Sequence, residues 1–273
     1  MNYISFRFFS FHKIVVLSML WILFGANYTM ADVLIGFEKS SGYEANATII
    51  GVTDTTIPGI KPWASTFGSS SFNALLEIST ANPQTGAQAL RLTNNAAGTA
   101  IGASLQLASN VDVKKTFNIH FSLALSEISE GTVNQAQVYF GAKGSQIGTF
   151  PYWFGLVYSN GSLSLALNSS DNSTAAFYIE LGSYTDYAKL GSYITFDIAI
   201  DPSTNKFTSV KLSGALKTAD LTKYVLSSAS GGTIPHLNSI PDTFFSLASG
   251  GNDTVIADLD NVYITGISPA STH

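Results

Sequence analysis

The sequence predicts an all-β fold in which two antiparallel sheets pack face to face as a β-sandwich. Short apolar or alternating runs recur along the chain, and clusters of Gly, Asn, Ser and Asp separate them, as in strands that are joined by turns. Long helical periodicity is absent, and no alternation of strands with helices indicates a parallel sheet. About a dozen such strands in one stretch of chain are typical of an antiparallel sandwich.

The predicted strands are, in chain order, Val33–Glu38, Ala87–Thr93, Ala103–Ala108, Phe117–Leu125, Gln135–Ala142, Tyr152–Tyr158, Ser162–Leu167, Ala175–Leu181, Tyr193–Asp201, Lys206–Leu212, Thr243–Ala248 and Val255–Thr265. Alternation is cleanest in Phe117–Leu125, where every second residue is apolar. Because successive side chains of a strand point to opposite faces, one face of this strand is predicted to be buried and the other to meet solvent or a polar groove.

Turn residues join these strands at short intervals. Asn160-Gly161 separates two predicted strands, and both residue types tolerate the positive φ angles of a tight hairpin. Asp201–Asn205 joins a later pair of strands and contains Pro202, whose fixed φ suits a turn. Thr218–Val225 is the one plausible helical turn, and Glu44–Pro83 is interpreted as a long decorated loop rather than a second domain.

Residues 1–31 are predicted to be a secretory signal peptide. Basic residues such as Lys13 precede the apolar run Ile14–Ala26, and Thr29 and Ala31 supply small residues at the −3 and −1 positions. About a dozen apolar residues are too few to span a bilayer as a mature helix, so cleavage after Ala31 is favoured over an uncleaved N-terminal anchor. The remaining chain is predicted to be secreted, periplasmic or at the cell surface, with no stable membrane insertion after cleavage.

The rest of the chain is interpreted as one sandwich domain over residues 32–268 and a short tail over 269–273. Its composition limits the partners and the chemistry that this domain can have. Charged residues are only 11% of the sequence, and no basic cluster exceeds Lys114-Lys115. Nothing here neutralises a row of phosphates, so nucleic acid is excluded as a partner. The absence of cysteine excludes disulfides and thiol chemistry, and the histidines are too few for a histidine-rich metal site.

Three short motifs carry a resemblance to a known family. They are Gly36-Phe37-Glu38, the run Gly86-Ala87-Gln88-Ala89-Leu90-Arg91-Leu92 and the closing Leu259-Asp260-Asn261-Val262. Together they resemble jelly-roll carbohydrate-binding modules and related concanavalin A-like, or laminin G-like, domains of secreted bacterial proteins. The resemblance implies a sandwich of jelly-roll type and a secreted, non-catalytic protein that binds a polysaccharide or surface glycan.

The same resemblance implies a structural calcium ion. In the family, an N-terminal Glu and an Asp on the last strand often bind calcium where the first and last strands pair. The matching residues are Glu38 and Asp260, with Asp258 two positions earlier. Calcium takes six to eight oxygen ligands, so backbone carbonyls would also be needed. The alternative is that these acids are ordinary strand and turn residues.

Aromatic and amide residues are the candidates for sugar contact. Sugar rings stack on aromatic side chains, and their hydroxyls pair with amides, carboxylates and imidazoles. Tyr152 and Trp153 lie in the densest aromatic stretch, and Gln137 and Tyr139 share one face of the preceding strand. His120 alternates with apolar neighbours and is predicted to face away from the core, where it could touch a ligand. These five residues form the predicted ligand-binding set.

Catalysis is the main alternative, and the sequence supports it weakly. The carboxylate pairs Glu127 with Glu130 and Asp258 with Asp260 do not match the pattern of laminarinase-like glycosidases. Tyr187–Tyr193 faintly resembles the Tyr-x-Lys-x-Gly-x-Tyr stretch of alginate lyases, without the companion motifs. A polysaccharide-degrading enzyme, lyase or glycosidase, therefore remains an alternative, and a structural or adhesive surface protein is another.

Overall fold

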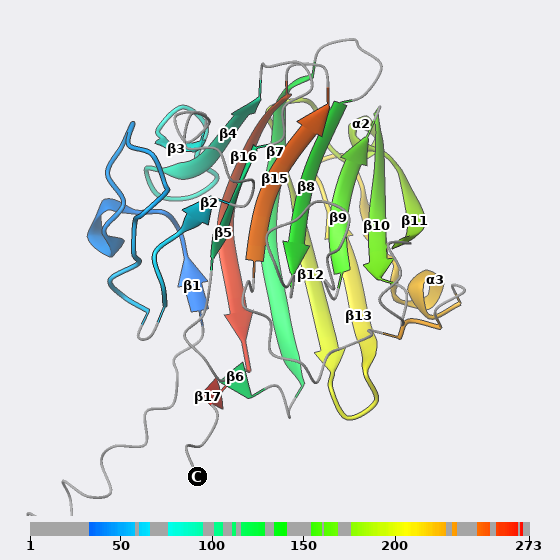
Figure 1. Ribbon diagram of the computed structural model, residues 1–273. Helices are drawn as coiled ribbons and strands as arrows, with labels where there is room; N and C mark the ends of the chain where they lie inside the picture. The colour runs from blue at the N-terminus through cyan, green and yellow to red at the C-terminus, as the bar shows by residue number, and fades with distance from the viewer. Residues whose placement is uncertain are drawn as a thin grey trace, which may run out of the picture. The chain divides into compact units, whose positions relative to one another are not determined.

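The computed structural model (Figure 1) describes residues 33–57, 60–65, 76–94, 101–105, 111–112, 116–128, 134–140, 154–159, 161–168, 176–227, 231–233, 245–251, 255–266 and 268–269. The chain divides into two units, Met1–Met30 and Ala31–His273, and every described residue belongs to the second. Within these ranges, no helix is long and apolar enough to cross a membrane. The predicted signal peptide lies outside the described residues and stays a prediction.

The first sheet has eight strands and contains both the first strand of the domain and its last long strand. Its order is β14-β13-β12-β7-β16-β4-β3, and β1 also pairs with β16. The bounds of these strands are β1 Val33–Ile35, β3 Leu76–Ser79, β4 Ala89–Asn94, β7 Phe117–Ile128, β12 Tyr193–Asp201, β13 Lys206–Ser213, β14 Thr218–Asp220 and β16 Val255–Thr265.

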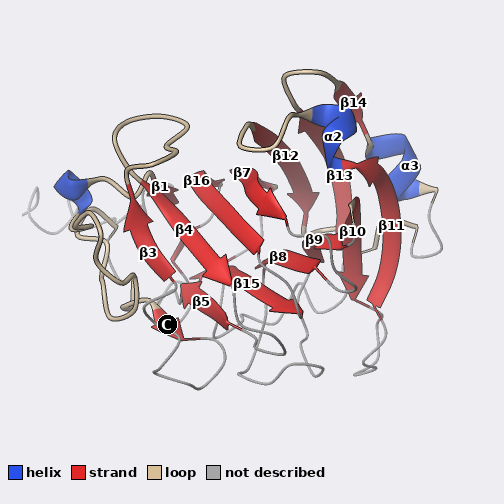
Figure 2. Ribbon diagram, turned by 90° about the horizontal axis from the view of Figure 1, so that it is seen from above, coloured by secondary structure: helices blue, strands red, loops and turns tan. Residues whose placement is uncertain are grey.

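The second sheet has seven strands in the order β11-β10-β9-β8-β15-β5-β2. Their bounds are β2 Ala64–Ser65, β5 Ile101–Leu105, β8 Asn134–Phe140, β9 Phe154–Ser159, β10 Ser162–Asn168, β11 Ala176–Ser183 and β15 Phe245–Gly251. A small ribbon pairs β6 (Val111–Asp112) with β17 (Ser268–Pro269). The helical elements are η1 Lys39–Ser41, α2 Tyr184–Tyr187 and α3 Thr222–Leu226, and Figure 2 shows α2 and α3 at the same end of the two layers.

The chain passes repeatedly between the two sheets. It runs from β4 to β5, back to β7, through β8–β11, back to β12–β14, and then from β15 to β16. All strand pairs among the described residues are antiparallel, and the first strand, β1, pairs with β16 near the end of the domain. The predicted antiparallel two-sheet sandwich of jelly-roll type is therefore confirmed.

The core lies between the sheets and follows the predicted alternation. Phe117, Ile119, Phe121, Leu123 and Leu125 of β7 are all fully buried. The Phe121 ring stacks on Phe196 of β12 with ring centroids 5.0 Å apart. Burying each such side chain contributes about 1.5–3 kcal/mol, and a chain without cysteine depends on this apolar packing.

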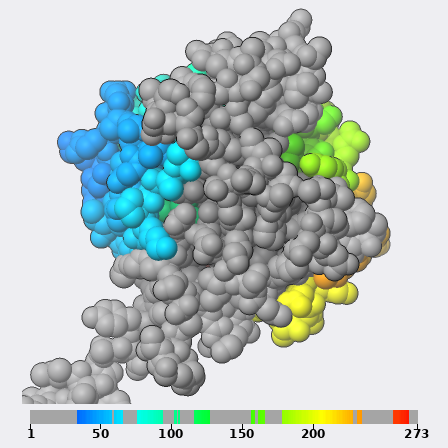
Figure 3. All heavy atoms as spheres, in the orientation of Figure 1, coloured from blue at the N-terminus to red at the C-terminus, as the bar shows by residue number. Residues whose placement is uncertain are grey.

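Three regions differ from the sequence prediction. The predicted strand Val33–Glu38 ends at Ile35, because Phe37 has a φ of +57° and η1 begins at Lys39. The predicted loop Glu44–Pro83 contains strands β2 and β3, and Trp63 within it is buried against Phe37, with Trp63 Nε1 donating to the Tyr43 hydroxyl at 3.2 Å. Figure 3 shows this N-terminal segment, in blue and cyan, gathered on one side of the view. The predicted helical turn Thr218–Val225 is part strand and part helix, because β14 precedes α3.

Candidate functional site

The structure separates the predicted ligand-binding residues between the two sheets. His120 lies on β7 of the eight-stranded sheet, whereas Gln137 and Tyr139 lie on β8 of the seven-stranded sheet. Tyr152 and Trp153 lie outside the described residues, as do the side chains of Gln137 and Tyr139. One binding face therefore does not combine His120 with the β8 residues.

His120 belongs to a row of polar residues that crosses five neighbouring strands. The strand register places Tyr263 of β16 opposite His120, and His120 opposite Asp197 of β12. The same register continues from Asp197 to Lys211 of β13 and from Lys211 to Asp220 of β14. Residues directly opposite each other in antiparallel strands share a face, so the row lies on the outer face of the eight-stranded sheet.

The centre of this row is a histidine–carboxylate pair that remains open to solvent. His120 Nδ1 lies 2.6 Å from Asp197 Oδ1, and their side chains are 31% and 52% exposed. The Tyr263 ring stacks on the imidazole with centroids 5.2 Å apart, and its hydroxyl donates to Asn261 Oδ1 at 2.7 Å. Because Asp197 orients one ring nitrogen, Nε2 is left as the hydrogen-bonding atom of the ring for a ligand.

The other half of the same outer face is covered and tightly bonded. Asp258 of β16 is fully buried, and the Arg91 guanidinium of β4 binds it through two contacts, Nε to Oδ1 at 2.6 Å and Nη2 to Oδ2 at 2.9 Å. Ser126 Oγ and Asn82 Nδ2 also donate to Asp258 Oδ2, at 2.7 and 3.1 Å. Asp258, predicted as a metal ligand, is thus compensated by a protein cation.

Asp260 holds the segment 82–88 against the sheet. Its carboxylate accepts hydrogen bonds from the backbone N–H groups of Gln84 at 3.0 Å, Thr85 at 3.1 Å and Asn261 at 2.7 Å. Burial raises the pKa of Asp260, these N–H groups oppose the rise, and the charge of Glu38 adds to it. Asp260 is therefore a buried carboxylate that anchors a loop.

Glu38 holds the next residues of the same segment. Its Oε1 accepts from the N–H groups of Ala87 at 2.8 Å and Gln88 at 3.3 Å. Gly86 has a φ of +64°, and a Cβ there would come within 2.0 Å of Glu38 Oε1. The positive φ and this close approach together favour glycine, which explains Gly86 in the motif.

These contacts do not test the predicted calcium ion, but they show how far the residues present would fit it. Among the described residues, no group of three or more His, Cys, Asp or Glu is placed to hold a metal. Asp258 does not fit, because Arg91 already supplies its counter-charge. Glu38 and Asp260 have oxygen donors of the right kind, and the buried side-chain oxygen of the adjoining Gln88 has no hydrogen-bond partner. A calcium ion at Glu38 and Asp260 stays a prediction.

The two tyrosines that end the lyase-like stretch Tyr187–Tyr193 are held by internal hydrogen bonds, whereas Lys189 and Leu190 between them are exposed. The side chain of Tyr187 is 2% exposed, and its hydroxyl donates to the Leu181 carbonyl at 2.8 Å. The Tyr193 hydroxyl donates to the Asn82 carbonyl at 2.5 Å, and burial raises its pKa. A catalytic base must lose its proton near neutral pH, so these contacts oppose that role.

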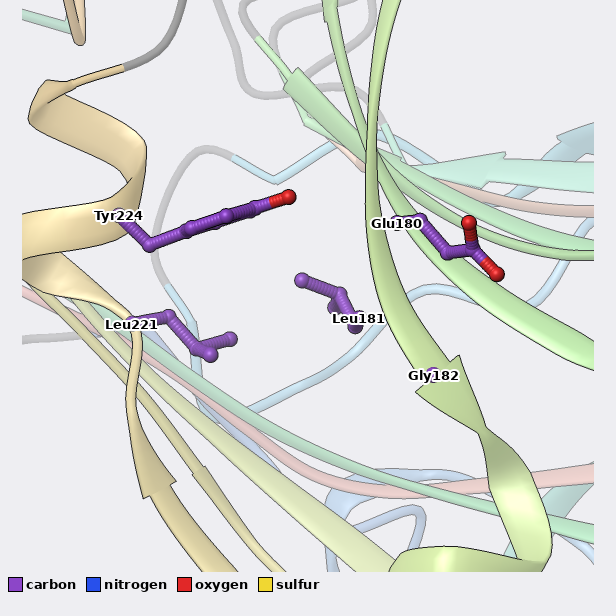
Figure 4. A pocket seen from close by; sticks show the side chains of 5 residues that line it. All are labelled: Glu180, Leu181, Gly182, Leu221 and Tyr224. Atoms are coloured by element: carbon purple, nitrogen blue, oxygen red, sulfur yellow. The ribbon is translucent and has the colours of Figure 1, made fainter.

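Sequence reasoning missed a shallow apolar groove between β11 and α3, with a volume of about 420 Å³, a size within the usual range of ligand sites. Its lining residues are Glu180, Leu181, Gly182, Leu221 and Tyr224. Figure 4 shows Leu181 and Tyr224 pointing toward one another across the groove, whereas the Glu180 side chain points away. Tyr224 is 53% exposed. The one sequence signal for this groove was that Tyr224 lies in the predicted helical turn Thr218–Val225.

Comparisons with known proteins find distant structural similarity and no related sequence. No protein-family model and no curated sequence matches the chain. Similar solved structures include a carbohydrate esterase from Shiga toxin-encoding bacteriophage phi24B (12% identity, TM-score 0.45, 76% of this chain and 90% of that chain). A PL-14 alginate lyase from Aplysia kurodai has 10% identity and a TM-score of 0.47 over 83% of this chain and all of that chain.

The binding domain of botulinum neurotoxin DC, in complex with SialylT, is also similar. It has 9% identity and a TM-score of 0.47, over 87% of this chain and 48% of that chain. At such identities the likeness concerns the fold alone, and function is argued from this chain's own residues.

Proposed function

We propose that this protein is a secreted, non-catalytic carbohydrate-binding protein that binds a polysaccharide or surface glycan on the outer face of its eight-stranded sheet. The observation that carries the proposal is the row of Tyr263, His120, Asp197 and Lys211 on four adjacent strands. Rigid strands hold its polar groups at fixed spacing, as a preorganised binding site requires.

The chemistry of this row suits sugar hydroxyls, each of which both donates and accepts hydrogen bonds. Asp197 accepts, Lys211 donates, and His120 does either according to its tautomer. Beside the row, Asn118 Nδ2 donates to Thr265 Oγ1 at 3.4 Å, so further amide and hydroxyl groups lie on the same face. The exposure of the His120–Asp197 pair leaves room for a ligand to bind both.

An enzyme acting on polysaccharide is the second candidate, and one observation favours it. A histidine oriented by a carboxylate is also the arrangement of a general base, and His120 has this arrangement with Asp197. Cleavage would further require a group that stabilises developing charge. A structural or adhesive role is the third candidate, and it requires no soluble ligand.

Binding and turnover assays on the mature chain separate these candidates. On a panel of soluble polysaccharides, we expect binding without cleavage and a loss of binding in Asp197→Ala. Glu44→Ala is the matched control, because Glu44 is 64% exposed and forms only a surface ion pair with Lys39, which contributes little. Reproducible cleavage that Asp197→Ala abolishes would establish the enzyme instead. No binding to any glycan at high protein concentration would overturn the proposal.

Secretion is part of the same proposal and is tested separately. The mature protein is expected to begin at Asp32, because cleavage is predicted after Ala31. N-terminal sequencing of protein recovered outside the cytoplasm of the expressing bacterium checks this start. A full-length chain that retains residues 1–31 would support the uncleaved anchor.

A further inference from the structure

We infer that the glycan bound on this face is neutral rather than acidic, so that uronate and sulfated polymers are poor ligands. The inference rests on the proposed function, since it names the ligand class of the same surface. It follows from how Arg91 and two lysines of this sheet are used, and from the acids that surround them.

The arginine of the mature chain is unavailable to an acidic ligand. Planar, bidentate recognition of carboxylate groups is the usual role of arginine. After residue 31 the sequence contains a single arginine, Arg91. Both of its contacts are to the buried Asp258, and its side chain is only 18% exposed. Releasing it would leave a buried carboxylate without its partner, which is costly.

The lysines on this part of the sheet are matched by acids. Register places Lys211 between Asp197 and Asp220, and it pairs Lys206 with Asp201 at the end of the same hairpin. Hydrogen bonds from Thr222 lower the pKa of Asp220, and the charge of Lys211 adds to this lowering. Three carboxylates therefore accompany two ammonium groups along these strands.

This balance repels a polyanion and leaves hydrogen bonding to neutral groups. Like charges across an interface slow association and disfavour the wrong partner, and the whole chain carries a formal charge of −5. A hydroxyl also lies next to the row, because the half-buried Thr195 is on the same face, with its Oγ1 3.0 Å from Oγ of the buried Ser122. Hydroxyl and carboxylate groups pair with the hydroxyls of a neutral sugar without burying an uncompensated charge.

The test compares neutral and acidic polymers on one protein. Calorimetric titrations of the mature chain use dextran, galactomannan and cellohexaose as neutral probes, and alginate, polygalacturonate and chondroitin sulfate as acidic probes. We expect at least one neutral probe to bind, and every acidic probe to bind at least about tenfold more weakly, a difference of about 1.4 kcal/mol. Ala199→Lys, which adds a cation beside the row, should strengthen acidic binding, whereas the control Ala199→Gln should not.

The outcomes distinguish the inference from the proposed function. If an acidic probe binds best and Asp197→Ala abolishes that binding, the face binds glycans but the inference about charge is wrong. If no probe of either class binds, the proposed function fails, and the inference fails with it.

Discussion

Each half of the outer face of the eight-stranded sheet contains a pair formed by a basic side chain and a carboxylate, and the two pairs lie in opposite surroundings. Arg91 and Asp258 approach to 2.6 Å beneath the segment 82–88, and Asp258 is fully buried. His120 and Asp197 also approach to 2.6 Å, but both side chains reach solvent. We call the first the covered half and the second the open half.

The two halves differ in whether their pair can still form hydrogen bonds to a ligand. In the covered half, the lone pairs of Asp258 are engaged by Arg91, Ser126 and Asn82. A buried pair of this kind is costly to break and has no bonding capacity left for a ligand. In the open half, an exposed pair contributes little to stability and can exchange water for sugar hydroxyls. Burial, and not the presence of charge, therefore distinguishes the structural pair from the pair that we propose to bind a ligand.

The largest expected effect is in the covered half. Arg91→Ala removes the partner of a buried carboxylate, so we expect the free energy of unfolding to fall by about 3–5 kcal/mol. Urea denaturation of the mature chain measures this, with the exposed Lys206→Ala as a matched control in the same sheet. A loss below about 1 kcal/mol would mean that Asp258 is not compensated as described.

A smaller loss is expected where the covered half is anchored. Asp260→Ala removes the charged acceptor of the part-buried backbone N–H groups of Gln84 and Thr85. Hydrogen bonds to a charged group contribute about 1.5–3 kcal/mol, so we expect the free energy of unfolding to fall by about that amount. Urea denaturation measures this loss in the free energy of unfolding. Hydrogen exchange is expected to show faster exchange at residues 84 and 85 in the variant, and unchanged protection there would contradict the anchoring role.

The predicted calcium ion would give Asp260 a second role, as a metal ligand. Binding to the folded state alone would stabilise it by about 2.7 kcal/mol at a free calcium concentration of a hundred times the dissociation constant. The wild-type melting temperature should then rise with calcium and fall with chelator, and Asp260→Ala should respond to neither. A wild-type melting temperature that is indifferent to both would show that backbone N–H groups alone compensate these acids.

The smallest effect is expected in the open half. His120→Ala removes an exposed pair and one ring of a stack, so the free energy of unfolding should change by less than about 1 kcal/mol. Glycan binding should nevertheless be lost, whereas the variants of the covered half are expected to lose stability. Thermal melts and calorimetric titrations on one preparation check both. A loss of stability as large as that of Arg91→Ala would make His120 a structural residue.

The long strands could be predicted from the sequence because their signal is local. Tyr193–Asp201 and Val255–Thr265 have the predicted bounds, since alternation and turn residues fix them. The Asp201 turn also forms as predicted, with Asp201 Oδ1 accepting from Ser203 N at 2.9 Å. The short strand β2 has too few residues to leave such a pattern.

The site could be predicted only in part because its contacts are distant in sequence. The outward orientation of His120 followed from alternation, but its partner Asp197 is 77 residues away. Nothing local to Asp258 indicates that Arg91, 167 residues away, binds it. The division of His120 from Gln137 and Tyr139 depends on which sheet each strand joins, and turn chemistry does not specify that.

Chemical-shift mapping of a bound neutral oligosaccharide tests the central claim most directly. Titrating a neutral sugar selected by the binding assays into the isotope-labelled mature chain should perturb amides around His120, Asp197 and Lys211. Amides lining the groove between β11 and α3, near Leu181 and Tyr224, should not move. Perturbations confined to that groove, with the His120 row unchanged, would contradict the claim that the open half of the sheet binds the glycan.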